Sequence, residues 1–173
     1  RQAYGDAGAI LTSDPDVADR CRRIANHGQS SRYHHEVIGF NSRLDTMQAA
    51  VLLARLPSLE RDNARRRVAA ERYSLLLKDT SDIVLPKSLP GNRHVWHHYV
   101  VGVRNRDEVR ERMAAQGVMT GVHYPLPLHQ QHAFASERWE DLPVAEELAR
   151  TCLSLPMFPQ ISAQQQRHVV QKL

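Results

Sequence analysis

Residues 39–45 read GFNSRLD. This stretch decides how the chain is organised, because a polar loop ends and a helical pattern begins there. Ser42 and Asp45 have the spacing of a capping box, so we expect Ser42 to cap the helix that follows. Leu44, Met47 and Val51 would form the apolar side of that helix. A second, longer helix should run from a break at residue 57, a proline, to about residue 78.

The residues before this stretch predict a strand, a helix and a loop. Residues 7–12 (AGAILT) are short and apolar, which favours a buried strand. Asp14 and Pro15 then suit the start of a helix, and Gly28 falls just beyond its end. Residues 29–40 gather so many polar and aromatic side chains that we expect a functional loop.

The residues after position 80 alternate between strand and helix signals. Strands are expected at 83–85, 95–103 and 118–124, and helices at 106–116, at 142–151 and after a cap at Ser162. Such a mixture predicts an α/β fold. We expect two pieces: residues 1–56 as the tail of a larger domain, and residues 57–173 as a small α/β domain.

The composition is that of an ordinary globular protein. Of 173 residues, 42% are hydrophobic and 24% are charged, which excludes disordered and fibrous classes. The first residues have no signal-peptide pattern, and no apolar run reaches the roughly 18 residues that a membrane-spanning helix needs. Cys21 and Cys152 fit no disulfide or metal motif. We therefore expect a soluble, cytoplasmic protein with reduced thiols and no membrane partner.

Much of the positive charge falls in residues 61–67 (RDNARRR), within a formal net charge of +4. A basic stripe can bind nucleic acid, and a nucleic-acid-binding regulator is one hypothesis for the chain. Glu60, Asp62 and Glu71 interrupt the stripe, however, and favour a solvated helix face with ion pairs. We therefore expect no nucleic-acid partner; DNA binding that weakens with salt would support the other hypothesis.

General catalytic patterns do not identify a reaction. The chain has ten histidines, but His97 and His98 are adjacent on a predicted strand and would point to opposite faces. His123 and His129 flank a proline-rich turn and could converge, although no helpful cysteine or carboxylate accompanies them. We therefore expect no metal site. A nucleophile elbow and a dinucleotide-binding fingerprint are also lacking.

Several stretches together resemble the DegT/StrS family of sugar aminotransferases along nearly the whole chain. Residues 4–10 (YGDAGAI) resemble the segment that follows the cofactor lysine in that family. The other matching stretches are 26–28 (NHG), 32–36 (RYHHE), 39–45 (GFNSRLD), 48–50 (QAA), 121–129 (GVHYPLPLH), 142–146 (LPVAE) and 153–157 (LSLPM).

The resemblance implies a pyridoxal-phosphate enzyme of fold type I, of which this chain would be the C-terminal part. Such enzymes work as homodimers with sites at the subunit interface. A Schiff-base lysine holds the cofactor, glutamate usually donates the amino group, and a nucleotide-linked keto-sugar accepts it. Products of this kind serve polysaccharide or deoxysugar biosynthesis. Residues 121–129 favour amination at C3, and C4 remains open.

The resemblance also implies that no catalytic residue lies in this chain, because the matching lysine would precede Arg1. Lys78, Lys87 and Lys172 are not in the matching context. The isolated chain is therefore expected to be inactive. The alternative is a truncated, non-catalytic homologue that acts as a binding or dimerisation module.

Some site residues are implied by the matching positions. Asn41 would reach the cofactor phosphate across the dimer, unless it only shapes the turn before the helix. Arg43 would meet a phosphate or the carboxylate of the donor, or else be a plain surface arginine. His123 and Tyr124 would line the sugar pocket, or else form a buried aromatic pair. Further substrate-binding candidates of the same kind are His129, Arg32, Tyr33 and His34.

Overall fold

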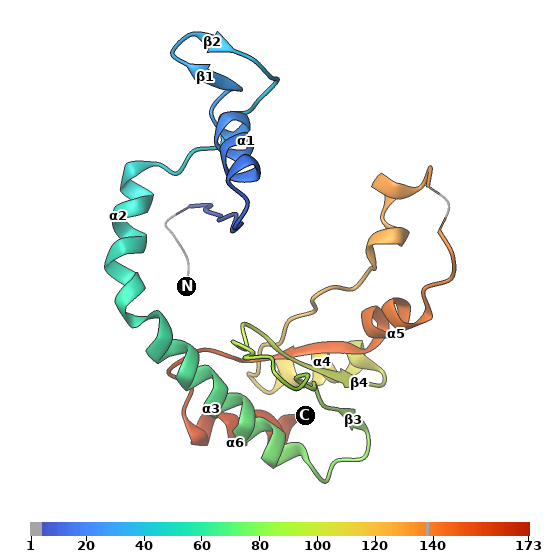
Figure 1. Ribbon diagram of the computed structural model, residues 1–173. Helices are drawn as coiled ribbons and strands as arrows, with labels where there is room; N and C mark the ends of the chain where they lie inside the picture. Colours follow the sequence, from blue (N-terminus) through green and yellow to red (C-terminus); the bar gives the residue numbers. More distant parts are fainter. Residues whose placement is uncertain (1–4, 138) are drawn as a thin grey trace. The chain divides into compact units, whose positions relative to one another are not determined.

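The computed structural model describes residues 5–137 and 139–173 and divides the chain into two compact units, Arg1–Leu59 and Glu60–Leu173 (Figure 1). The division lies close to the expected boundary after residue 56. Tyr4, the first residue of the stretch 4–10, lies outside the described residues.

The first unit is built around helix α1 and a small hairpin. Its elements are α1 (Pro15–Ala25), β1 (Gln29–Ser31), β2 (His34–His35), α2 (Thr46–Arg55) and the 3-10 turn η1 (Leu56–Ser58). The side chain of Asp14 accepts hydrogen bonds from the backbone N–H groups of Asp16 and Val17, at 2.9 and 3.2 Å. This cap, and Pro15 as the first residue of the helix, confirm the predicted helix start.

Two predictions for the first unit were wrong. Residues 7–12 form no strand, because no neighbouring segment of the described chain pairs with their backbone. Ser42 does not cap α2, which begins at Thr46; the residue at the cap is Asp45, and its side chain makes no capping bond. The loop 29–40 contains the hairpin of β1 and β2, which the sequence did not predict.

The second unit is a three-stranded antiparallel sheet packed by helices. Its sheet order is β3-β4-β5, so that β4 lies in the middle. The elements are α3 (Leu59–Leu77), β3 (Ile83–Val84), β4 (Tyr99–Val103), α4 (Arg106–Ala115), η2 (Leu128–Gln130), η3 (His132–Phe134), α5 (Pro143–Thr151), β5 (Cys152–Leu155) and α6 (Ala163–Lys172). The α/β class expected from the sequence is confirmed.

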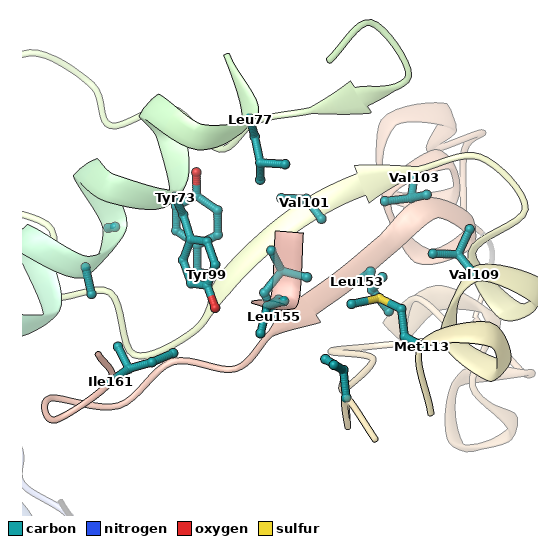
Figure 2. Close-up of a cluster of buried hydrophobic side chains, with 14 residues drawn as sticks. Tyr73, Leu77, Tyr99, Val101, Val103, Val109, Met113, Leu153, Leu155 and Ile161 are labelled. Atoms are coloured by element: carbon teal, nitrogen blue, oxygen red, sulfur yellow. The ribbon is translucent and has the colours of Figure 1, made fainter. Parts of the chain in front are cut away.

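A single hydrophobic cluster fills the space between this sheet and its helices (Figure 2). Tyr73 of α3 and Tyr99 of β4 are fully buried, with ring centroids 5.1 Å apart. Met113 of α4 and Leu153 of β5 complete the centre of the cluster. The first unit has no comparable core: among its described residues, only Gly28 is buried.

Helices α3 and α6 lie side by side and are joined by a buried glutamine (Figure 1). Gln166 of α6 is fully buried. Its Nε2 donates to the carbonyl oxygen of Ala69 at 2.7 Å, and its Oε1 accepts from Arg72 at 2.7 Å. Because both ends of the amide are satisfied, this polar group lies in the interior without the cost of an unpaired one.

The capping box of α6 is confirmed and gives a stability prediction. The Ser162 hydroxyl accepts from the N–H of Gln165 at 3.1 Å, and the Gln165 side chain accepts from the N–H of Ser162 at 2.8 Å. We expect Ser162→Ala to lower the free energy of unfolding by about 1 kcal/mol, measured by urea denaturation. Ser88→Ala, at an exposed loop position, is the control. Equal stability of the two variants would contradict the prediction.

Two strand predictions in this unit need correction, and one strand was not predicted. The strand expected at 95–103 begins only at Tyr99, because Trp96 has a positive φ of 51° and is not extended. The strand expected at 118–124 is reduced to one bridge between Gly121 and Ser154. Strand β5 was missed, because four residues directly after a helix are too few to show a strand period.

The basic stretch 61–67 is only partly the solvated face that was expected. Glu60 bonds Arg67 at 2.9 Å and Arg93 at 2.5 Å, as in an ion-paired surface. Arg66 instead turns inward and donates to the carbonyl oxygens of Trp96, His97 and Met157 at 3.0–3.2 Å. It therefore ties α3 to the segments before β4 and after β5.

Candidate functional site

The loop that carries Asn41 returns to the end of helix α1 and is held there by backbone hydrogen bonds. The N–H of Phe40 donates to the carbonyl oxygen of Ile24 at 2.7 Å, and the N–H of Ser42 donates to that of Ala25 at 2.9 Å. The N–H of His27 donates to the carbonyl oxygen of Phe40 at 2.8 Å. These bonds fix Asn41 in one place beside the helix end.

Two glycines make this close return possible. Gly28 has a φ of +70°, and a β-carbon there would overlap the carbonyl oxygen of Val37. A β-carbon on Gly39 would overlap the backbone nitrogen of Gly28. Only glycine fits both positions, because the two backbone segments touch where a side chain would lie.

Asn41 and Arg43 form a pair with hydrogen-bond donors to spare. The Nε of Arg43 donates to the Oδ1 of Asn41 at 3.1 Å, and both side chains are exposed. Because an arginine can only donate, the amide oxygen faces it and the Nδ2 group points elsewhere. The pair therefore offers an N–H₂ group and a guanidinium, which is the donor set that binds a phosphate dianion.

The three other candidates of this unit lie on the β1–β2 hairpin. The guanidinium carbon of Arg32 is 4.9 Å from the centre of the Tyr33 ring, a cation–π contact. His34 is exposed in β2, and its neighbour His35 anchors the hairpin through a 2.8 Å contact with the carbonyl oxygen of His27. Arg32, Tyr33 and His34 are therefore accessible to a ligand.

The candidates of the second unit gather on the loop 121–129. The imidazole of His123 is held by Ser154 of β5, with its Nδ1 2.8 Å from the serine Oγ. The ring of His98 stacks on it at 4.1 Å between centroids, with 17° between the planes. Tyr124 packs edge-on against His123 at 5.5 Å. The structure thus places the rings of His123 and Tyr124 in contact on this loop.

His129 lies on the same loop and is paired with a carboxylate. Its Nε2 is 3.1 Å from the Oε1 of Glu146, which lies in the first turn of α5. The side chain of His129 is 10% exposed. His123, Tyr124 and His129 all line one cavity of about 830 Å³ between the loop and α5. Most of the other lining side chains are apolar: Pro125, Leu126, Leu128, Trp139, Leu142 and Leu148.

In the part of the chain that the structure describes, no group of three His, Cys, Asp or Glu side chains is placed to hold an ion. Partial removal from water lowers the pKa of His98 below its usual value, and nearby His123, His97 and Arg66 lower it further. The lowered pKa favours the uncharged form of the His98 ring.

The two cysteines are free thiols, Cys21 half-buried and Cys152 buried. The Cys152 side chain lines the same cavity as His123. No helix of the described residues is long and apolar enough to cross a membrane.

The family model of the DegT/DnrJ/EryC1/StrS aminotransferases matches residues 2–173. The chain belongs to this family. The resemblance drawn from the motifs is therefore confirmed, and with it the fold class. Aminotransferases of the DegT/DnrJ/EryC1/StrS family depend on pyridoxal phosphate, and the Asn41–Arg43 pair has the donors that a cofactor phosphate requires.

Curated relatives match almost the whole chain. A "pleiotropic regulatory protein" of Geobacillus stearothermophilus is 45% identical over 99% of this chain and 47% of its own length. The UDP-2-acetamido-2-deoxy-3-oxo-D-glucuronate aminotransferase of Pseudomonas aeruginosa is 46% identical over 90% of this chain and 43% of its own length. The chain thus spans about half the length of these relatives.

A solved structure of the family agrees with the fold. S. venezuelae DesV superposes with a TM-score of 0.93 at 42% identity, covering 98% of this chain and 46% of the DesV chain. The arrangement of elements described above is therefore that of a DegT-family aminotransferase over the corresponding half of its length.

The sequence missed the residues that hold the candidates in place. Ser154 orients His123, and Glu146 orients His129. The ring of His98 stacks on that of His123. Ser154 and Glu146 both lie within stretches that match the family, 153–157 and 142–146. That match was the available signal, but it could not say which histidine each residue contacts.

Proposed function

We propose that the chain is the C-terminal portion of a pyridoxal-phosphate-dependent nucleotide-sugar aminotransferase. The enzyme would move an amino group from glutamate to a nucleotide-linked keto-sugar, in polysaccharide or deoxysugar biosynthesis, as a cytoplasmic homodimer. The family match over residues 2–173 carries the proposal. The cavity lined by His123, Tyr124 and His129 supports it, because apolar walls with a few polar groups suit a small-molecule site.

Residues 1–56 would belong to the large cofactor domain and residues 57–173 to the small domain. The exposed apolar side chains of the first unit support this assignment. Ile10, Leu11 and Ile38 are 74%, 94% and 94% exposed, and a larger domain would cover such surface.

The residues of this chain would bind, orient and exclude water. Asn41 and Arg43 would donate to the cofactor phosphate. His123, Tyr124 and His129 would hold oxygens of the sugar nucleotide, and the apolar wall around them would keep water out. Arg32, Tyr33 and His34 would reach substrate from the exposed hairpin. The cofactor itself supplies the electron sink for amino transfer.

The full-length enzyme should aminate a keto-sugar nucleotide in the presence of pyridoxal phosphate and glutamate. Mass spectrometry of the product checks this with 3-keto and 4-keto hexoses linked to UDP or dTDP. We expect the 3-keto substrate to be preferred, as the name of the P. aeruginosa relative suggests. The isolated 173-residue chain should be inactive, because Lys78, Lys87 and Lys172 do not match the context of the cofactor lysine.

Asn41→Ala should weaken binding of pyridoxal phosphate to the full-length enzyme about 10- to 150-fold, because one charge-assisted hydrogen bond is lost. The measurement is a fluorescence titration of the cofactor-free protein. Asn92→Ala, at an exposed loop position, is the matched control and should bind like the parent. An unchanged affinity in Asn41→Ala would remove this residue from the cofactor site.

The alternative is a non-catalytic binding or dimerisation module. It is favoured by one observation, that the G. stearothermophilus relative carries the name of a regulatory protein. A full-length protein that dimerises but neither retains pyridoxal phosphate nor aminates any of the four substrates would support this alternative.

A further inference from the structure

The ring of His123 is confined on three sides. Ser154 lies on β5 and is 4% exposed; its backbone pairs with Val100 on one side and with Gly121 on the other. Its hydroxyl contacts the Nδ1 of His123 at 2.8 Å. The His98 ring stacks at 4.1 Å on the imidazole. A β-carbon on Gly121 would lie 2.7 Å from the Cε1 of His123, so only glycine leaves room for the ring there.

The buried hydroxyl decides which ring nitrogen carries the proton. A serine hydroxyl has one hydrogen to donate, and a buried hydroxyl that donates to nothing costs free energy. Among the described residues, Nδ1 of His123 is the side-chain partner found for the Ser154 hydroxyl. If the hydroxyl donates to Nδ1, both groups are satisfied, and the imidazole proton must then lie on Nε2.

The opposite arrangement leaves a donor unused. If Nδ1 carried the proton, it would donate to the Ser154 oxygen, and the hydroxyl hydrogen would need another acceptor inside the structure. The pKa of the neighbouring His98 is lowered by partial removal from water, which favours the uncharged form of its ring. The geometry therefore favours a single tautomer of His123.

We infer that Ser154 is a positioning residue that keeps the proton of His123 on Nε2, so that the imidazole presents an N–H donor, and not a lone pair, to an oxygen of the substrate. The role of the donor rests on the proposed function, since a sugar nucleotide is rich in carbonyl, hydroxyl and phosphate oxygens. His123 lines the cavity in which such an oxygen would be held.

The tautomer can be measured without cofactor or substrate. Long-range ¹H–¹⁵N correlation spectra of the full-length protein labelled at histidine nitrogen show which ring nitrogen is protonated, and His123→Gln assigns the signals. We expect a pyrrole-like Nε2 and a pyridine-like Nδ1 for His123. In Ser154→Ala both shifts should move toward the average of two exchanging tautomers. A proton on Nδ1 in the parent protein, or an unchanged spectrum in Ser154→Ala, would overturn the inference.

Kinetics separate positioning from simple structural support. Ser154→Ala should raise KM for the keto-sugar nucleotide about three- to tenfold, the worth of one hydrogen bond, with little change in kcat. Ser154→Thr keeps the hydroxyl and should restore both the spectrum and KM, whereas Ser88→Ala should alter neither. An equal loss of kcat in Ser154→Ala and Ser154→Thr would indicate a structural role only.

Failure of this inference is distinguishable from failure of the proposed function. A protein that aminates no sugar nucleotide but shows the predicted tautomer overturns the proposed function and keeps Ser154 as the group that positions His123. A protein that aminates its substrate with the His123 proton on Nδ1 overturns the inference alone.

Discussion

Tyr73→Ala is expected to lower the free energy of unfolding of the chain by about 3–5 kcal/mol, because it removes a fully buried aromatic ring from the centre of the core. The ring packs on Tyr99, and its hydroxyl donates to the carbonyl oxygen of Pro156 at 2.9 Å. Burial raises the pKa of the Tyr73 phenol, with a further contribution from Tyr99, so the hydroxyl stays protonated and remains a donor across the neutral range.

Urea denaturation followed by circular dichroism measures this loss, and two variants divide it. Tyr73→Phe keeps the ring and leaves the Pro156 carbonyl oxygen without its donor, so it should cost about 1–3 kcal/mol. Leu75 lies on the same helix and is 64% exposed. The free energy of unfolding of Leu75→Ala should therefore stay within about 0.5 kcal/mol of that of the parent. A Tyr73→Ala variant as stable as Leu75→Ala would show that the core is not organised around this ring.

Gly28→Ala should disrupt the loop that carries Asn41. The new methyl group would overlap the carbonyl oxygen of Val37 at a positive φ, which combines overpacking with backbone strain. We expect a local loss of about 2–5 kcal/mol from these two costs. In the full-length protein, the amide hydrogens of Phe40 and Ser42 should then exchange at least about 30-fold faster, and cofactor affinity should fall.

Hydrogen exchange with peptide-level mass spectrometry measures the effect, and Gly91→Ala is the matched control. Gly91 also has a positive φ, of +81°, but nothing lies within 4 Å of its added β-carbon. That variant carries the strain without the overlap and should leave the exchange of Phe40 and Ser42 unchanged. Parent-like exchange at these two amides in Gly28→Ala would mean that the contact between the loop and α1 does not hold Asn41.

Sequence reasoning succeeded where the signal is local. Asp14 and Ser162 cap the helices that they were predicted to cap, because a cap needs only the next few backbone N–H groups. It failed where a distant partner decides the outcome. Among the described residues, 7–12 have a strand composition but no pairing segment, and 118–124 pair only at Gly121. Ser42 is not the cap because Asp45 is still extended, with a φ of −63° and a ψ of 143°, and the helix begins only after it.

The candidate site shows the same division. The family motifs led to Asn41, His123, Tyr124 and His129 one position at a time. The contact of His123 with Ser154 spans 31 residues, and that of His129 with Glu146 spans 17, so only the folded chain reveals them. Periodicity and propensity carry no information about which serine meets which histidine.

The visible absorption spectrum of the full-length protein, loaded with pyridoxal phosphate, tests the central claim most directly. We predict a protein-bound visible band that glutamate removes and that a 3-keto sugar nucleotide then restores, since the two additions are the two halves of one amino transfer. A protein that forms no such band, or whose band responds to neither glutamate nor any keto-sugar nucleotide, would contradict the assignment of this chain to a nucleotide-sugar aminotransferase.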